Sequence, residues 1–535
     1  MLTERLDFDA IIIGAGFSGL YQLYKLRDEV GLSVQIFEAA DNVGGTWYWN
    51  RYPGARCDSE SHTYCYYFSE KLLKKWEWSE RYPGQAEILE YLSFVTDTLG
   101  LRNNISFNRR ITQSEFLESE KIWLITDNSG KQYRSKYVIN AVGCLSTANK
   151  PDIPGIKKFN GETYHTGEWP HEEVSFSNKK VGVIGTGSSG IQAIPVISET
   201  ARCLTVFQRT PNYSVPARNQ KLSKEFINDF KNKTQDWLEK MLLSRGGHAW
   251  PLPLKHAFDT PEQERLEIMN NAWQNGGLGF RECFDDILTN ITSNNIMSEF
   301  LKDKIRSIVK NPDKARALSD IDHPFSTKRP PIDTNYFETY NKPNVSLVDI
   351  RKDPIKEIFD NGLRTFSDEF ELDIIVFATG FDAMTGSILK MDIKGRDNSS
   401  IKNIWSAGPK TYLGLQVAGF PNMFFLTGPG SPSVLTNMPR AIEQHVDWVT
   451  ECISHMESNN LNSVEATPEA VESWVDHVND TANKTLLPKA KHSWYLGANV
   501  PGKPRVFMPY TGGLNNYRDI CNKIAKDGYA GFLFS

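Results

Sequence analysis

The chain has 535 residues, of which 40% are hydrophobic and 23% charged, the composition of an ordinary globular protein. Its net charge of −5 provides no basic excess, which excludes nucleic acid and anionic membranes as default partners. No apolar run reaches the ~18 residues of a membrane span, and the N-terminal stretch has acids where a signal peptide has a basic region. We expect a cytoplasmic protein, with no obligate protein partner evident.

Residues 8–37 have the pattern of a dinucleotide-binding unit. The hydrophobic run 8–13 predicts a buried strand, and a G-x-G-x-x-G turn, a helical pattern and a second strand at 33–37 follow it. Glycines in such a turn let the backbone approach a pyrophosphate at the helix N-terminus, and the acid after the second strand can accept hydrogen bonds from ribose hydroxyls. The predicted FAD contacts of this unit are Gly14, Gly16, Ser18, Gly19 and Glu38.

The same pattern recurs at 180–209, with one informative change. Where the first unit has an acid, the second has Arg209 at the same spacing. A carboxylate would repel a ribose 2′-phosphate, whereas an arginine can bind it with two hydrogen bonds. The second unit is therefore predicted to bind NADPH, with Lys180 and Lys328 as further candidate cations. Its predicted turn residues are Gly185, Thr186, Gly187, Ser188, Ser189 and Gly190.

A helical insertion is predicted at about 220–320. Leu222, Phe226 and Phe230 recur at a four-residue spacing that places them on one helix face. Further along, Thr260 and Pro261 predict a helix with threonine at the N-cap and proline at the first position, ending at the glycine pair 276–277. The aromatic residues of this region are expected to be core.

Two further strands mark where the chain crosses between the units. The run 373–382 predicts a buried strand that ends in A-T-G-F-D, and 137–143 is its earlier counterpart. The predicted fold class is α/β, with two Rossmann-like dinucleotide-binding domains, one for FAD and one for NADP, and a helical insertion in the NADP domain.

The cysteines and histidines limit the chemistry. The seven cysteines include no C-x-x-C pair and the ten histidines have no metal-binding spacing, so no metal site is expected. Cys57 and Cys65, the nearest two cysteines, are separated by seven residues, which disfavours a redox-active pair. Electrons from the flavin are therefore expected to pass to dioxygen or a small acceptor.

The segment 159–170 reads FNGETYHTGEWP. It resembles the F-x-G-x-x-x-H-T-x-x-W-P fingerprint of type I Baeyer–Villiger monooxygenases at every defined position, and the resemblance runs along essentially the whole chain. In that family the segment is a linker whose histidine and tryptophan help to position the two domains. The matching residues are Phe159, Gly161, His165, Thr166, Trp169 and Pro170.

The resemblance also implies a domain plan and further contacts. The FAD domain would comprise 1–145 and 383–535, and the NADP domain 146–382, with a mobile loop at about 490–505 that folds over NADP. Residues 428–438 look like the active-site loop, in the longer form seen in the branch similar to phenylacetone monooxygenase. The implied contacts are Thr46, Trp47, Asp58, Tyr64, Ile111 and Met438 for FAD, Arg209, Thr210, Lys328, Arg329 and Trp494 for NADP, and Ser433, Val434 and Leu435 for the substrate.

Arg329 matches the family's essential arginine, and Asp58 matches the aspartate that pairs with it. The implied reaction uses NADPH and dioxygen to form a C4a-peroxyflavin, which attacks a ketone and inserts one oxygen atom next to the carbonyl to give an ester or lactone. A permanently charged guanidinium can stabilise the peroxide anion and the adduct that follows.

Three other functions remain open. A flavin-containing monooxygenase that oxidises amine nitrogen or sulfide sulfur would use the same cofactors, although its peroxide should be protonated. An NADPH oxidase without coupled oxygenation is a further alternative. A non-enzymatic NADP-binding regulator or redox sensor would not need Arg329, Asp58 and a mobile lid together.

Overall fold

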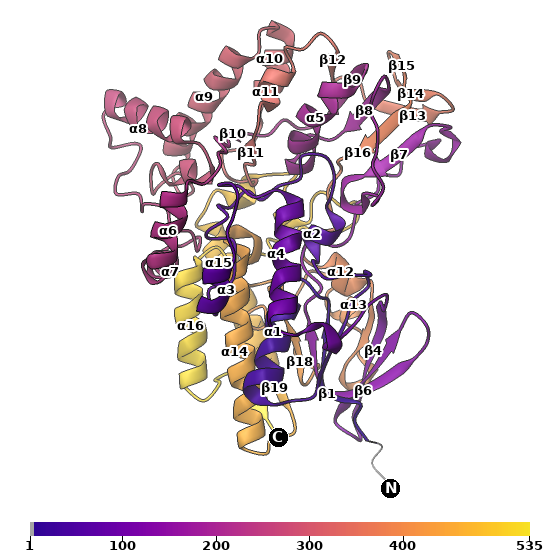
Figure 1. Cartoon of the computed structure of the whole chain (residues 1–535), viewed down its shortest axis with the longest axis vertical. Coiled ribbons are helices and arrows are strands. Elements are labelled where there is room, and N and C mark those ends of the chain that lie inside the picture. Colours follow the sequence, from indigo (N-terminus) through magenta and orange to yellow (C-terminus); the bar gives the residue numbers. More distant parts are fainter. Residues whose placement is uncertain (1–4) are drawn as a thin grey trace.

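The computed structural model describes residues 5–535 and forms two lobes along the long axis of the molecule (Figure 1). One lobe is built on an eight-stranded sheet and the other on a five-stranded sheet. The predicted fold class, with two Rossmann-like units and a helical insertion, is confirmed. No helix of the described chain is long and apolar enough to cross a membrane.

The larger sheet has the order β17-β4-β5-β6-β1-β2-β3, with β18 beside β6. Strand β1 runs parallel to β2 and β6, and β18 also runs parallel to β6, so the carboxyl ends of these strands share one edge. The strands are β1 (Phe8–Ile13), β2 (Val34–Phe37), β3 (Ile105–Ser106), β4 (Ile111–Leu117), β5 (Ile122–Asp127), β6 (Gln132–Asn140), β17 (Asp392–Lys394) and β18 (Met423–Phe425).

The smaller sheet is parallel throughout and has the order β12-β9-β8-β16-β7. Its central strands are almost wholly buried, as expected for a parallel sheet covered on both faces. The strands are β7 (Glu162–His165), β8 (Lys180–Ile184), β9 (Cys203–Gln208), β12 (Val345–Asp349) and β16 (Ile374–Phe377). Smaller sheets pair β10 (Val215–Pro216) with β11 (Ile332–Asp333), β13 (Ile355–Phe359) with β14 (Gly362–Thr365) and β15 (Glu369–Glu371), and β19 (Val464–Ala466) with β20 (Phe532–Phe534).

Helices from both ends of the chain complete the lobe of the larger sheet. Helix α1 packs against the long helix α14, and both contribute to one hydrophobic core. Figure 1 shows α14 and α16 beside the N-terminal helices, although they lie hundreds of residues later. The helices of this lobe are α1 (Phe17–Tyr24), α2 (Thr46–Trp49), α3 (Glu70–Lys75), α4 (Gln85–Thr98), α12 (Gly386–Leu389), α13 (Ile401–Ile404), α14 (Met438–Ser458), α15 (Pro468–Asn483) and α16 (Leu514–Lys526).

The helical insertion packs against both lobes. Phe230 of α6 and Met241 of α7 belong to the core around α1 and α14, whereas Trp273 of α8 and Phe300 of α9 belong to the core of the smaller sheet. The insertion therefore bridges the two sheets. The helices of the insertion and the smaller sheet are α5 (Ser188–Thr200), α6 (Lys224–Asn232), α7 (Thr234–Leu243), α8 (Glu262–Asn275), α9 (Ile291–Ile308), α10 (Pro312–Ser319) and α11 (Tyr336–Thr339).

Four local predictions were wrong. Helix α8 begins at Glu262 with Pro261 at the N-cap, because the Thr260 hydroxyl donates to the His256 carbonyl instead of capping the helix. Leu222 precedes α6, whose N-cap is Ser223. Strand β6 ends at Asn140, so the predicted strand 137–143 runs three residues too far. Strand β16 ends at Phe377, so the predicted strand 373–382 runs five residues too far, because the chain there leaves the sheet and pairs with the other crossing segment.

The two crossings between the sheets lie side by side. The amide of Asn149 donates to the Gly380 carbonyl at 2.9 Å, and the amide of Asp382 donates to the Thr147 carbonyl at 2.9 Å. Ala148 and Phe381 form an antiparallel bridge between these contacts. The segments 141–149 and 378–382, here called the crossing ribbon, thus form a two-stranded connection between the lobes.

Candidate functional site

A cavity of about 860 Å³ opens at the carboxyl ends of β1 and β6. This volume is typical of small-molecule and cofactor sites. Its wall also includes Arg329, Val434 and Trp494, which come from distant parts of the chain. The residues of its wall that the sequence assigned to FAD are Gly14, Gly16, Ser18, Glu38, Thr46, Trp47, Asp58, Tyr64, Ile111 and Met438.

The turn between β1 and α1 permits no side chain at two of its glycines. Gly14 has φ +106°, and a Cβ atom there would lie 2.6 Å from the Ala141 carbonyl oxygen. A Cβ atom at Gly19 would lie 1.9 Å from the Gly14 carbonyl oxygen. Gly19 is absent from the cavity wall because its function is this close packing behind the turn. The bare backbone and the N-terminus of α1 fit a bound pyrophosphate.

Glu38 presents a buried carboxylate to the cavity. Its oxygens accept hydrogen bonds from the amides of Ala15 at 2.6 Å and Ala40 at 2.8 Å. Burial raises the pKa of Glu38, and these two amides oppose the shift. Because an ionised carboxylate can accept about four hydrogen bonds, acceptor capacity remains for two ribose hydroxyls.

Asp58 and Arg329 form a partly buried ion pair at the cavity wall. The Arg329 Nε donates to Asp58 Oδ2 at 3.2 Å, although 271 positions separate the residues in the sequence. Burial alone would lower the pKa of Arg329, but Asp58 and Tyr495 raise it above its usual value. The guanidinium therefore stays charged. The buried Asp58 Oδ1 has no hydrogen-bond partner within residues 5–535, and this free acceptor fits a donor group of a bound cofactor.

A second contact fixes the other side of the guanidinium. Arg329 Nη1 donates to the Val434 carbonyl at 3.1 Å. Ser433, the preceding residue, is buried and has φ +40°, a strained value for a residue with a side chain. Ser433, Val434 and Leu435 form one 3-10 turn, η7, and of these three only Val434 is in the cavity wall. The sequence predicted this loop, but it gave no signal for the backbone contact.

The turn between β8 and α5 repeats the geometry of the first turn. Gly185 has φ +113°, and a Cβ atom there would lie 2.4 Å from the Ala378 carbonyl oxygen. A Cβ atom at Gly190 would lie 2.3 Å from the Gly185 carbonyl oxygen, whereas one at Gly187 would meet nothing within 4 Å. The Thr186 hydroxyl donates to the Thr210 carbonyl at 3.1 Å. This turn, with Ser188 and Ser189 opening α5, fits the phosphates of NADP.

Two of the three candidate cations meet beside this second turn. Arg209 follows β9 and is exposed, and its charge acts on Lys328. Burial lowers the pKa of Lys328 to about 8, with Asp322 opposing and Arg209 adding to the shift. Lys180 was wrongly predicted: it lies at the start of β8, at the opposite end from the turn, and its Nζ pairs with Glu371 at 2.6 Å.

The fingerprint lies on the edge of the smaller sheet. His165 ends β7, and its Nε2 lies 3.2 Å from the Thr379 hydroxyl, which also donates to the Asn149 carbonyl at 2.6 Å. Part of the expected linker is thus a strand, and it contacts the crossing ribbon through Thr379. The other fingerprint residues lie around this strand: Phe159 packs in a core beside the sheet, Gly161 has no room for a side chain, Thr166 and Trp169 are buried, and Pro170 follows.

The loop at 490–505 is docked on the crossing ribbon. The Asn499 side chain donates to the Phe381 carbonyl at 2.8 Å, and Lys503 Nζ pairs with Asp382 at 2.5 Å. Trp494 from the same loop reaches the wall of the large cavity. This arrangement connects the C-terminal loop to both the cavity and the crossing between the lobes.

One direct contact between the lobes was missed by the sequence analysis. Gln192 of α5 accepts a hydrogen bond from the Tyr52 hydroxyl at 2.7 Å and donates to the Arg56 carbonyl at 3.1 Å. These contacts join the helix of the second turn to the segment that leads to Asp58. No local sequence pattern identifies such a contact, because its partners are distant in the chain.

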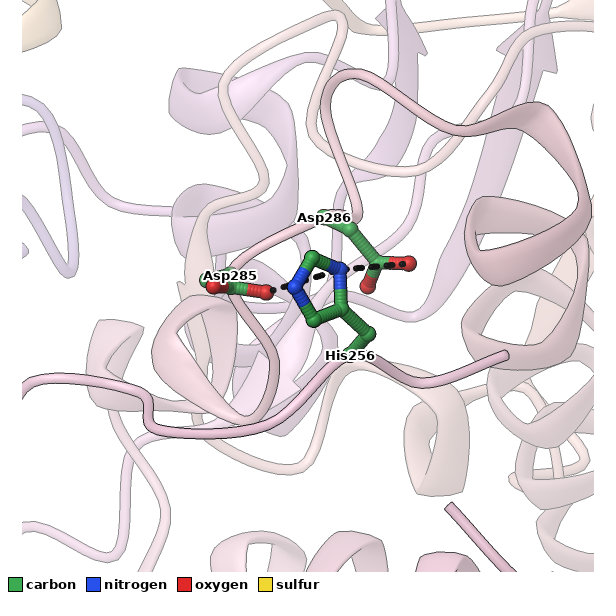
Figure 2. A group of neighbouring side chains, drawn as sticks. All are labelled: His256, Asp285 and Asp286. Carbon is green, nitrogen blue, oxygen red and sulfur yellow. Dashed lines mark ion pairs between the residues drawn. The ribbon is translucent and has the colours of Figure 1, made fainter. Parts of the chain in front are cut away.

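His256, Asp285 and Asp286 form a group of side chains in the insertion (Figure 2). The sequence spacing did not predict it. The Asp286 carboxylate already accepts hydrogen bonds from the Ala257 amide and the Ser293 hydroxyl. These bonds tie the segment before α8 to the start of α9, which accounts for the group as part of the fold.

Comparison with known proteins identifies the class. Residues 11–243 match a family described as pyridine nucleotide-disulphide oxidoreductase. A cyclohexanone 1,2-monooxygenase of Acinetobacter sp is 41% identical to this chain, and a Baeyer-Villiger monooxygenase of Pseudooceanicola batsensis is 42% identical. Both matches cover 99% of this chain and 97% of the relative's own length. A solved steroid monooxygenase bound to NADP has a TM-score of 0.94 and 45% identity over 98% of this chain and 99% of its own. The structure of OTEMO with FAD and NADP has a TM-score of 0.96 and 38% identity over 99% and 100%.

The chain therefore belongs to the Baeyer–Villiger monooxygenases, a family of flavoprotein oxygenases with two dinucleotide-binding units. It is an FAD-dependent enzyme that takes its electrons from NADPH. The family resemblance seen in the sequence is confirmed, and placement in the branch of phenylacetone monooxygenase stays a prediction.

The family is not uniform in the atom that it oxidises. Phenazine N-monooxygenase PhzNO1 of Lysobacter antibioticus is 42% identical over 99% of this chain and 98% of its own length. Overall identity therefore does not by itself separate oxidation beside a carbonyl from oxidation of nitrogen. The residues around the cavity have to make that distinction.

Proposed function

We propose that the chain converts a ketone into an ester or lactone by inserting one oxygen atom between the carbonyl carbon and its neighbour. A ketone, dioxygen, NADPH and a proton give the ester, NADP⁺ and water. The observation that carries this proposal is the charged Arg329 at the cavity wall, held by both Asp58 and the Val434 carbonyl.

Arg329 is the proposed catalytic residue. Bound FAD would supply the redox chemistry, by accepting a hydride from NADPH and passing the electrons to dioxygen. The guanidinium would stabilise the negative charge that develops on oxygen when the carbonyl is attacked, and its fixed position avoids the cost of reorganisation during the reaction. Asp58 would position the guanidinium through a charge-assisted hydrogen bond. An amine or sulfide develops no such oxyanion, which favours the carbonyl substrate.

The remaining predicted residues are assigned to the two cofactors. The ten wall residues and Gly19 would hold FAD, while the turn 185–190, Arg209, Thr210 and Lys328 would hold NADP, with Arg329 and Trp494 at the contact between them. Residues 433–435 would line the substrate position. We also propose the boundaries 1–145 and 383–535 for the FAD domain and 146–382 for the NADP domain, and a loop at 490–505 that moves during the cycle.

We further propose that the enzyme works in the cytoplasm, with no nucleic acid, membrane or obligate protein partner. All seven cysteines are free thiols, which suits a reducing compartment. The net charge of −5 provides no general attraction for nucleic acid or anionic lipid.

The deciding experiment is product mass spectrometry under ¹⁸O₂. The purified holoenzyme receives NADPH and, in separate reactions, cyclohexanone, phenylacetone, a linear ketone, a thioether and a tertiary amine. One labelled oxygen in an ester or lactone is the expected result. Label found only in the sulfoxide or N-oxide, with no ketone converted, would contradict the proposal and favour the heteroatom oxygenase. Oxidation of NADPH without any labelled organic product would indicate an oxidase.

A further inference from the structure

A chain of three side chains holds the backbone of Arg329. The Asn212 side-chain amide donates to the Arg329 carbonyl oxygen at 3.2 Å, although 117 positions separate the two residues. Asn212 Oδ1 lies 3.2 Å from His323 Nε2, and His323 Nδ1 lies 3.3 Å from Asp322 Oδ1. The side chain of Asp322 is half exposed, so the chain leads from the surface to the backbone of the proposed catalytic arginine.

This chain connects two parts of the site. Asn212 lies two residues after the proposed coenzyme contact Thr210, whereas Arg329 belongs to the loop that follows α10. His323 lies in that loop, its side chain is 2% exposed, and its ring packs edge-to-face on Tyr213 at 5.5 Å between centroids. The segment proposed to hold NADP is thus joined to the loop that carries the catalytic arginine.

The first half of this loop is fixed independently of His323. The Asn294 side chain of α9 donates to the Phe325 carbonyl at 2.9 Å and accepts a hydrogen bond from the Phe325 amide at 2.8 Å. These bonds do not involve the imidazole ring. Loss of the contact between His323 and Asn212 should therefore leave the loop folded while it frees the Arg329 carbonyl.

The donors and acceptors along the chain require a proton on both ring nitrogens. A carbonyl oxygen can only accept, so the amide NH₂ group of Asn212 must face Arg329 and its Oδ1 must face His323. Nε2 must therefore carry a proton. Nδ1 faces the Asp322 carboxylate, which also only accepts. The ring that satisfies both neighbours is the imidazolium, with Asp322 as its counter-charge.

A neutral ring can satisfy only one of the two neighbours. A hydrogen bond to a carboxylate is stronger than one to a neutral amide oxygen, so the single proton should stay on Nδ1 and face Asp322. Nε2 would then present a lone pair to the Asn212 oxygen, and the two acceptors would repel each other. Loss of the charge should therefore loosen Asn212 and, through it, the Arg329 carbonyl.

The groups that face the ring determine when it is charged. They are Asp322 and Lys328 of its own loop, Lys302 of α9 and the Tyr213 ring. Burial lowers the pKa of His323 and Asp322 opposes the shift, whereas the two lysines add to it. Lys328 is a proposed contact of the coenzyme phosphate. A bound phosphate would offset the positive charge of Lys328, so coenzyme binding should favour the imidazolium.

We infer that His323 is a positioning residue for Arg329, which acts in its charged form through the Asn212 amide and gains that charge when the coenzyme binds. The inference rests on the proposed function, because it assumes that Arg329 is the catalytic residue. Small displacements of a catalytic group lower the rate steeply. Enzyme with a displaced Arg329 should therefore waste its electrons: NADPH, dioxygen and a proton would give NADP⁺ and hydrogen peroxide instead of ester.

The first test measures coupling, defined as ester formed per NADPH oxidised, in short assays at pH 5.5 and 7.5. The substrate is cyclohexanone and NADPH is saturating. Lys328 stays charged over this range because its pKa is about 8. Coupling in wild type should fall at least threefold as the pH rises, with hydrogen peroxide replacing the lost ester, while the rate of flavin reduction changes less than twofold.

Three variants separate the charge from the hydrogen bond. His323→Gln keeps a side-chain donor that cannot titrate, and Asp322→Asn offers a donor to the neutral ring, so both should keep high coupling at both pH values. His323→Leu has no donor and should couple poorly at both. His256→Gln removes an exposed histidine of the insertion and should keep the wild-type fall.

A binding measurement keeps the test independent of turnover. Calorimetry of NADP⁺ binding at pH 6.5, in buffers of different ionisation enthalpy, gives the number of protons that the holoenzyme takes up. Wild type should take up about 0.3 proton more than His323→Gln, and His256→Gln should match wild type. The difference should vanish with NAD⁺, which has no 2′-phosphate.

The outcomes distinguish the inference from the proposed function. Wild-type coupling that stays constant between pH 5.5 and 7.5 would overturn the inference, and so would equal proton uptake by wild type and His323→Gln. If His323→Gln couples as poorly as His323→Leu, the histidine has only a structural role and the inference is wrong. If no ketone gives an ester at either pH, the proposed function itself is wrong.

Discussion

At the scale of single residues, the site depends on charges fixed by partners that are distant in the chain. Arg329 is held between the Asp58 carboxylate and the Val434 carbonyl, so the guanidinium cannot turn away from the cavity. Ser433, the residue before Val434, has a strained backbone with φ +40°. Such strain is typical of functional sites, where the surrounding structure enforces it.

Replacing Arg329 should leave reduction of the flavin by NADPH intact but impair formation of the ester. In Arg329→Ala, NADPH should still bleach the flavin, because hydride transfer needs no oxyanion stabilisation. Formation of ester should fall by ~10²-fold or more, the usual effect of removing one such donor. Stopped-flow absorbance follows the first step and gas chromatography the second. Arg316→Ala, on an exposed helix, is the charge-matched control. Ester formation at the wild-type rate would remove Arg329 from the chemistry.

Lys328 should make NADPH binding depend on pH. Because its pKa is lowered to about 8, the free enzyme carries this charge below pH 8 and loses it above. The KM for NADPH should therefore rise by about tenfold between pH 7 and 9.5, since a charge-assisted hydrogen bond contributes about 1.5–3 kcal/mol. In Lys328→Arg the charge persists and the KM should stay flat. A KM for NADH that rises equally would exclude recognition of the 2′-phosphate.

Arg209 should determine the choice of coenzyme. Arg209→Ala is expected to weaken the binding of NADPH by at least tenfold and the binding of NADH much less, because only NADPH has the 2′-phosphate. The ratio of kcat/KM values for the two coenzymes measures the effect. Arg202→Ala, an exposed arginine before β9, is the control. Equal losses for both coenzymes would contradict the assignment.

At the scale of elements, the two strand–turn–helix units have the same backbone geometry but differ in the charge of the residue that follows the second strand. Both turns exclude a side chain at the first and last glycine, because a carbonyl oxygen occupies the space. The acid after β2 and the arginine after β9 then distinguish the two ligands. The pattern was recognisable from sequence since the constraint is local.

A glycine exchange tests the second turn. In Gly190→Ala the new Cβ would lie 2.3 Å from a backbone oxygen that cannot easily move, so a loss of about 1–3 kcal/mol in stability is expected. Gly187→Ala meets nothing within 4 Å and should leave the melting temperature unchanged while weakening NADPH. Differential scanning fluorimetry with and without NADPH distinguishes these effects. Equal melting temperatures for the two variants would contradict the packing argument.

At the scale of the whole molecule, the lobes are joined by the crossing ribbon, by Gln192 and by the insertion. Thr379 is central to the ribbon, since its hydroxyl contacts both Asn149 and His165. Thr379→Val should lower the free energy of unfolding by about 1 kcal/mol. It should also slow flavin reduction, because the two lobes would be held less firmly in position relative to each other. Thr385→Val removes a buried hydroxyl that has no hydrogen-bond partner among residues 5–535 and should cost little stability. Urea unfolding and stopped-flow reduction compare the pair, and equal behaviour of the two variants would contradict this function of Thr379.

The limits of the sequence analysis follow the range of the interactions. Strands β1 and β8 and both glycine turns were predicted at their exact positions, because backbone conformation restricts the residues allowed there. The meeting of Asp58 with Arg329 was implied only by the family resemblance, since nothing local relates them. The split packing of the insertion and the Gln192 contact were missed, because both depend on segments brought together by folding. The N-cap of α8 was wrongly assigned to Thr260, since the Thr260 hydroxyl donates to the His256 carbonyl instead.

The larger sheet combines strands made before and after the smaller sheet, and this order has a consequence for synthesis on the ribosome. The smaller sheet uses a contiguous stretch, 162–377, so it can close soon after its last strand emerges. The first-made strands must instead wait for β18 and α14. At a translation rate of about 5–20 residues per second, that delay is roughly 20–90 s. During this interval the apolar surface of α1 has no cover, so the nascent chain should depend on chaperones or early FAD capture for protection against aggregation.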